Sequence, residues 1–123
     1  MVFTPIASVL LVVSAQAAVA PPAADHAQLS LEQRTAIRCS SLFAIVARQQ
    51  EAGDAEALEY PPMMPRGREF FVRTMAKMME DPAFDRERVR DLLADEALAL
   101  AGDREAQAAA IPPCLALLDL AEL

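Results

Sequence analysis

Cys39 and Cys114 are the two cysteines of this chain, and their side chains offer its most distinctive chemistry. Cys39 lies in the middle of an amphipathic stretch, and Cys114 opens an apolar run. Two cysteines in an oxidising compartment most simply form one disulfide. We predict a Cys39–Cys114 bond, which would close a long loop and stabilise the fold by roughly 4 kcal/mol. A free Cys114, made reactive by its place at a helix start, is the alternative.

Methionines offer a second chemistry, because thioether sulfur is a ligand that monovalent copper favours. Met63 and Met64 lie close together, and Met75, Met78 and Met79 share one face of a predicted helix. The same spacing suits a core stripe, in which methionine fills irregular gaps. We therefore interpret these residues as core and expect no cofactor. Copper binding through Met75, Met78 and Met79 is the alternative.

Charged residues supply two further candidates. Glu96 falls among the core positions of a predicted helix, so its carboxylate must lie at the rim, pair with an arginine of another helix, or take up a proton. We expect a rim position or a structural ion pair rather than a functional acid. Arg66, Arg73 and Lys77 lie on one side of a helix and could form a small basic patch, with ordinary exposed cations as the simpler interpretation.

No catalytic residues are predicted. The chain has three glycines and a single histidine, His26, which we expect to be solvent-exposed. It lacks a nucleophile with a matching base, a glycine-rich phosphate loop and a C-x-x-C motif. The sequence therefore favours a protein that is not an enzyme and has no metal site built from the usual ligands.

The N-terminal segment resembles a secretory signal. Residues 1–24 carry no charge, and an apolar block, Ile6 to Val13, precedes a run of small residues. This pattern predicts a signal peptide over residues 1–17 with cleavage after Ala17, although the usual basic residue near the start is missing. An uncleaved anchor is the alternative, but the block is shorter than the roughly 20 residues that span a bilayer. We expect a periplasmic or secreted protein.

The remaining chain suffices for one small domain. We expect a flexible, Ala/Pro-rich lead-in over residues 18–29 and a single helical domain over residues 30–123. The net charge of −7 falls entirely after residue 24. An acidic surface argues against nucleic acid or an anionic membrane as partner, so the expected partner is another protein.

The first helix is predicted to begin after Ser30, which forms a capping-box pattern with Gln33, and to end before Gly53. One side of its helical wheel holds the expected core residues Leu31, Ala36, Cys39, Leu42, Phe43, Val46 and Ala47. The opposite side holds Arg34, Arg38, Ser41 and Arg48.

Two further helices are indicated by apolar residues at helical spacing. A helical turn over residues 54–59 and a proline-rich connector, with Tyr60, Met63 and Met64 against the bundle, lead to a helix from Arg68 to Glu80. Its expected core face holds Phe71, Val72, Met75, Met78 and Met79. The next helix, Arg86 to Ala101, is capped by Asp85 and ends at Gly102, with an expected core stripe of Val89, Leu92, Leu93, Ala97 and Leu100.

The last section is predicted to form a short helix over residues 103–110 and then a terminal helix with Pro112 and Pro113 in its first turn. No stretch shows the alternation or glycine turns of a strand. The predicted fold is all-α, a small bundle of about four helices pinned by one disulfide.

Several short motifs resemble a group of small exported proteins from alphaproteobacteria. These are Arg38-Cys39-Ser40, Tyr60-Pro61-Pro62, the run from Arg66 to Val72, and Pro113-Cys114-Leu115. The resemblance implies export and a helical, disulfide-linked fold, and it implies no particular activity. We expect a binding or interaction protein of chaperone, inhibitor, immunity or accessory-subunit type. An acid-stress chaperone of the periplasm is a second alternative.

Overall fold

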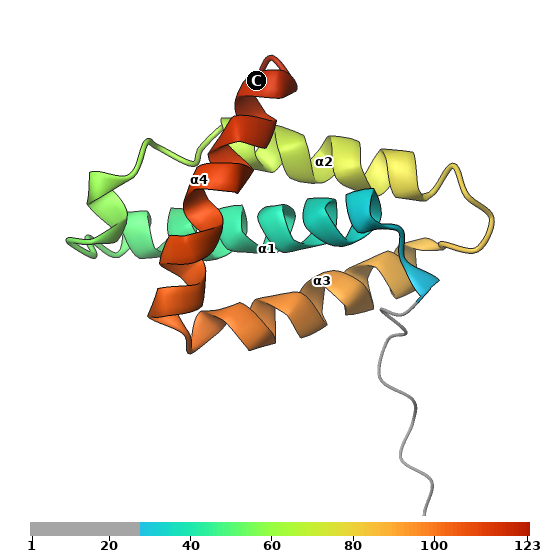
Figure 1. Cartoon of the computed structure of the whole chain (residues 1–123), viewed down its shortest axis with the longest axis horizontal. Helices are drawn as coiled ribbons and strands as arrows, with labels where there is room; N and C mark the ends of the chain where they lie inside the picture. The colour runs from blue at the N-terminus through green and yellow to red at the C-terminus, as the bar shows by residue number, and fades with distance from the viewer. Residues whose placement is uncertain (1–27) are drawn as a thin grey trace, which may run out of the picture.

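Four α-helices and one short 3-10 turn make up residues 28–123, the part of the chain that this computed structural model describes. The elements are α1 (Leu31–Glu51), η2 (Ala57–Glu59), α2 (Arg66–Met78), α3 (Arg86–Ala101) and α4 (Arg104–Leu120). In Figure 1, α2 and α3 lie on either side of α1, and α4 runs across it. The all-α prediction is confirmed. The predicted signal peptide, and the lead-in up to residue 27, lie outside the described residues.

The ends of α1 follow from local chemistry. Ser30 Oγ accepts a hydrogen bond from the Gln33 amide at 3.1 Å, and Gln33 Oε1 accepts one from the Ser30 amide at 2.8 Å. This capping box, predicted from the sequence, satisfies two donors that the helix start leaves unpaired. Gly53 has a φ of +78°, the left-handed conformation that ends a helix and that glycine adopts without strain.

α1 is buried on more than one side because it packs against each of the other three helices. Ser41, expected on the solvent side, is buried, and its hydroxyl donates to the carbonyl of Leu93 on α3 at 3.0 Å. Leu31, expected in the core, is instead 74% exposed. The prediction of a single apolar face on this helix was therefore wrong at these two positions.

A disulfide joins Cys39 on α1 to Cys114 on α4, with an S–S distance of 2.07 Å and a sequence separation of 75. Both residues are buried, and neither of them is free. The predicted bond is confirmed, and the alternative of a reactive Cys114 thiol is wrong.

The buried apolar residues form two clusters. The first surrounds the disulfide and joins α1 and α4 to Met63 and Phe70. The second joins Ile37 of α1 to the end of α2 and to α3, and it includes Leu29. Leu29 was expected in a flexible lead-in, but it is buried, so the folded domain already includes this residue.

α2 begins and ends two residues earlier than predicted and presents a different face to the core. Its buried line is Gly67, Phe70, Thr74 and Met78. The expected core residues Val72 and Met79 are exposed, whereas Phe71 and Met75 are partly buried against the second cluster. In the connector, Met63 is buried as predicted, but Met64 is exposed.

Gly67 allows α2 to pack closely against α1. A Cβ atom at this position would lie 2.9 Å from the Cβ of Phe43, closer than real Cβ contacts. The missing side chain lets α2 approach α1, and Phe70, one turn later, then meets Phe43 edge to face with ring centroids 5.4 Å apart. The close approach at Gly67 therefore selects the buried face.

α4 is one continuous helix, although a break at Pro112 and Pro113 was predicted. Each proline removes one backbone donor, which leaves the carbonyls of Ala108 and Ala109 without their helical partners. All four of these residues are exposed, so water can satisfy both carbonyls. Ile111 and Cys114 on the opposite side are buried in the first cluster, and this packing outweighs the local preference for a break.

α3 agrees with its prediction in extent and cap. Asp85 accepts a hydrogen bond from the Arg88 amide at 2.8 Å, and the helix ends at Ala101. Four of the five expected core residues are buried, and Ala97 is partly buried. Gly102 has a φ of −94°, so it does not take the left-handed form that a terminal glycine suggests. Asp103 directly caps α4 instead, by accepting from the Ala106 amide at 2.9 Å.

The contact at Gly67 gives a testable prediction with a matched control. Gly67→Ala should lower the free energy of unfolding by about 1 to 3 kcal/mol, because the added methyl group overpacks against Phe43. Gly102→Ala has nothing within 4 Å of the new methyl group and should be neutral or stabilising by up to about 1 kcal/mol. Urea unfolding of the oxidised proteins measures both changes. Equal effects of the two substitutions would contradict the close approach of α2 to α1.

Candidate functional site

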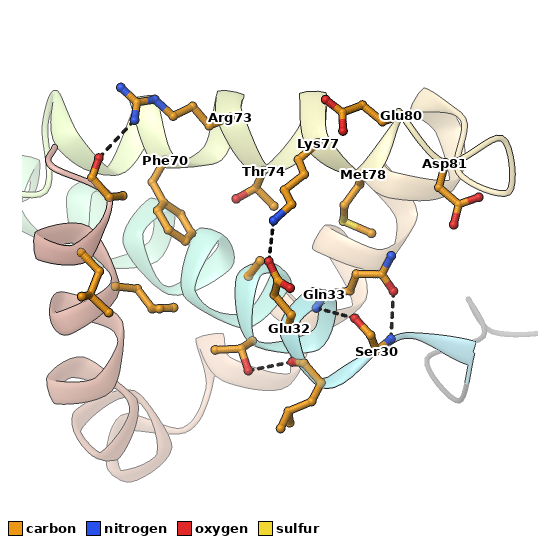
Figure 2. A pocket seen from close by; sticks show the side chains of 16 residues that line it. Ser30, Glu32, Gln33, Phe70, Arg73, Thr74, Lys77, Met78, Glu80 and Asp81 are labelled. Carbon is orange, nitrogen blue, oxygen red and sulfur yellow. Dashed lines mark hydrogen bonds and ion pairs between the residues drawn. The ribbon is translucent and has the colours of Figure 1, made fainter.

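A groove with an apolar floor lies between the first turns of α1, the length of α2 and the last turns of α4 (Figure 2). Its volume is about 1180 Å³. We call it the α1/α2/α4 groove. It is lined by Ser30, Leu31, Glu32, Gln33, Thr35, Ala36, Phe70, Arg73, Thr74, Lys77, Met78, Glu80, Asp81, Leu117, Leu120 and Ala121.

Two leucines of this lining remain in contact with solvent. Leu31 is 74% exposed and Leu120 is 80% exposed, whereas Phe70 and Met78 on α2 are buried. The groove therefore has a packed apolar floor and large apolar side chains at its opening. Exposed apolar surface that gathers at a concave site is typical of binding sites rather than of ordinary protein surface.

The wall formed by α4 is held in place by the cations of the predicted basic patch. Arg66 Nη2 lies 2.8 Å from Asp119 Oδ1, and Arg66 Nε donates to the main-chain oxygen of Leu123. Arg73 Nη1 donates to the carbonyl of Ala121 at 3.2 Å, one of the dashed lines in Figure 2. These arginines bind the end of α4 to α2, and they do not form a free basic surface.

Lys77, the third cation of the predicted patch, spans the groove. Its Nζ lies 2.5 Å from Glu32 Oε1 on α1, and Figure 2 shows this pair between the α1 and α2 walls. The hydrogen bond from Lys77, and then its charge, lower the pKa of Glu32 below its ordinary value of 4.5. The same contacts raise the pKa of Lys77. Both side chains are exposed, so the pair contributes little to stability and can be displaced.

A similar pair lies outside the groove. Arg104 on α4 contacts both oxygens of Asp54, in the turn after α1, at 2.8 and 3.2 Å. The hydrogen bond from Arg104, followed by the one from the Ala57 amide, lowers the pKa of Asp54 below its ordinary value of 3.8. The pair fixes the start of α4 beside the end of α1.

Glu96 pairs with Arg38 of α1, whose Nη1 lies 2.8 Å from Glu96 Oε1. The carboxylate is only partly exposed, and its cation comes from another helix, which is one of the arrangements that the sequence allowed. The pair lines a second groove between α1, α3 and α4, and both cysteines also line that groove. Glu96 thus contributes to the contact between α1 and α3.

The methionines of the copper alternative occupy three different environments. Met78 is buried, Met75 is partly buried against the second cluster, and Met79 is exposed. Within residues 28–123 no group of three or more His, Cys, Asp or Glu side chains could hold a metal ion. Copper binding through Met75, Met78 and Met79 stays a prediction.

Comparisons with protein-family models, curated proteins and solved structures find no significant match to this chain. Among the described residues, none of the helices is long and apolar enough to cross a membrane.

Sequence reasoning did not identify the α1/α2/α4 groove. Of its lining, only Arg73, Lys77 and Met78 were among the candidate residues. One sequence signal points to the groove. The predicted terminal helix carries leucines at positions 115, 117, 118 and 120, more than one face of a helix can bury.

The lowered pKa values of Glu32 and Asp54 give a prediction with an internal control. Lys77→Gln should raise the pKa of Glu32 toward 4.5 and leave Asp54 unchanged, whereas Arg104→Gln should raise only the pKa of Asp54 toward 3.8. A folded-state pKa below the unfolded value means that each pair stabilises the fold above the ordinary pKa and loses this effect as the pH falls through the lowered value. Carboxyl chemical shifts followed by NMR measure both values. If neither substitution changes its partner carboxyl, the two pairs do not persist in solution.

Proposed function

We propose that this chain is an exported, non-enzymatic interaction protein that binds a segment of another protein in the α1/α2/α4 groove. The observation that carries the proposal is the exposure of Leu31 and Leu120 at an apolar groove, in a fold that buries most of its other large apolar residues. A partner that covers these leucines would gain the free energy of removing apolar surface from water.

Export is supported by two independent features. The first 24 residues carry no charge and resemble a secretory signal. The Cys39–Cys114 bond is compatible with an oxidising compartment, since such bonds are rare in the reducing cytosol.

The polar side chains of the groove favour binding over catalysis. Ser30 and Gln33 bond each other in the capping box, and Thr35 donates to the carbonyl of Leu31 at 2.8 Å within the same helix. Glu32 and Lys77 neutralise each other across the opening. These five groups are engaged within the fold, so the part of the groove that they border offers a ligand chiefly apolar surface.

Substitutions at three equally exposed leucines test the proposal. Leu31→Asp and Leu120→Asp place a charge at the groove, whereas Leu98→Asp does so on α3, where Leu98 is 78% exposed outside the groove. The full chain is expressed in its native host, cross-linked in the envelope and analysed by intact mass with alkylation. We expect a partner that is captured by the wild type and by Leu98→Asp and is lost from both groove variants.

Two outcomes would contradict the proposal. A partner captured equally by all variants would place its binding site elsewhere. A full-length mass beginning at Met1, with both thiols alkylated without reductant, would show that the chain is not exported.

A second candidate, the acid-stress chaperone, is supported by one feature of the described ion pairs. Four carboxylates join different elements through ion pairs of 2.5 to 2.8 Å, namely Glu32, Asp54, Glu96 and Asp119. Protonation removes the carboxylate charge from every one of these contacts, and the remaining cations then repel one another. Acid would therefore weaken all four junctions together.

Acid titration tests this candidate. The chaperone requires that the bundle loosens at pH 2 to 3 and exposes apolar surface, which a hydrophobic dye detects while far-UV circular dichroism stays helical. Disulfide-linked protein that keeps its dispersed NMR spectrum at that pH would rule the candidate out.

A further inference from the structure

The charges along the α1/α2/α4 groove differ between its two ends. Arg73 lies toward the end near α4, and Glu80 and Asp81 lie at the other end, just after α2 (Figure 2). Arg73 is bonded to α4, as described above. Within residues 28–123 no cation lies within 4 Å of the Glu80 or Asp81 carboxylate, although the charge of Glu80 contributes to the raised pKa of Lys77. The Asp81 carboxylate accepts from the Ala83 amide at 2.9 Å. Because Lys77 is already paired with Glu32, the end beyond α2 carries net negative charge.

The C-terminus of α2 adds to this negative potential. The last carbonyls of a helix carry the negative end of its dipole, and α2 ends at Met78, directly before the two acidic residues. Lys77 lies next to this end, and it interacts with Glu32 on the opposite wall more strongly than with Glu80. A ligand that fills the groove would meet apolar side chains along the floor and negative charge at this end.

The walls of the groove indicate which kind of segment fits. They are helices, and residues 28–123 contain no strand whose edge could bind an extended peptide. Phe70 is the single aromatic residue of the lining, whereas grooves for polyproline segments are lined by several. An amphipathic helix laid on an apolar groove is the recognition mode that remains.

The length of the floor sets the size of the apolar face that the groove can cover. Phe70 and Met78 are eight residues apart on α2, which corresponds to about 12 Å along the helix axis. This distance matches about two turns of a partner helix. Leu31 and Leu120 would then lie beside the partner helix. Their exposed side chains can contact apolar residues at positions i, i+3, i+4 and i+7 of that helix.

We propose that the α1/α2/α4 groove binds an amphipathic α-helix of a partner protein, with basic residues of that helix meeting Glu80 and Asp81. This inference rests on the proposed function and adds the conformation and the charge of the bound segment.

The test uses two synthetic helical peptides with the same apolar face and one tryptophan. One peptide carries two lysines at one end, and the other carries two glutamates there. The chain contains no tryptophan, so the indole emission reports on the peptide alone. With oxidised full-length protein, we expect the lysine peptide to bind at least about tenfold more tightly than the glutamate peptide, because like charges are unfavourable at a binding site.

A matched pair of double substitutions locates the charge effect. Glu80→Gln with Asp81→Asn keeps the acceptor for the Ala83 amide and should reduce the preference to less than about twofold. Glu87→Gln with Glu105→Gln removes the same charge at exposed positions outside the groove and should retain the tenfold preference. Leu120→Asp, at a residue that lines this groove and not the second one, should abolish the binding of both peptides.

The outcomes separate this inference from the proposed function. Equal binding of the two peptides to the wild type, lost in Leu120→Asp, would overturn the charge preference alone. Absence of peptide binding, together with a cross-linked partner that depends on Leu120, would overturn the proposal of a bound helix and leave the groove as a binding site. Absence of both the peptide binding and the partner would overturn both proposals. A dimer that Leu120→Asp dissociates, or a fatty acid seen as added native mass, would assign the groove to a different occupant.

Discussion

The Cys39–Cys114 bond is the constraint on which the position of α4 depends. It joins the middle of α1 to α4 within the larger of the two core clusters, and it fixes where α4 crosses α1. Leu117 and Leu120 follow Cys114 by three and six residues, and Thr35 and Ala36 precede Cys39 by about one turn. These four residues line the groove that α2 completes. Arg66 and Arg73 then tie the end of α4 to α2.

The sequence was sufficient to predict those structural features that depend only on residues close together in the chain. The capping box at Ser30, the left-handed Gly53 and the cap at Asp85 follow from rules that act within one turn, and the structure confirms them. Features that depend on tertiary packing were predicted less well. The continuous α4 contradicts the local effect of Pro112 and Pro113, because the disulfide and the buried side of the helix keep it continuous.

The candidate site was even harder to predict from the sequence than the fold. Its walls come from helices far apart in the sequence, so no local pattern marks the groove as one surface. Helical periodicity alone placed Leu31 in the core and Arg73 on a free face. In the structure, Leu31 borders the groove, and Arg73 is bonded to α4. The apolar pattern of α2 alone also did not predict which face the helix buries. That face depends on Gly67, whose missing side chain lets α2 lie close to Phe43 on α1.

The division of the core into two clusters bears on the order in which the protein folds. The second cluster draws on α1, α2, Phe84 and α3, all of which precede α4 in the chain. The first cluster and the disulfide require Ile111, Cys114 and Leu118 of α4. The residues of the second cluster are therefore all present before α4 has been synthesised, and Cys39 has no disulfide partner until then. Both the disulfide and one wall of the groove come from α4, so the last helix to be made completes the core and the groove together.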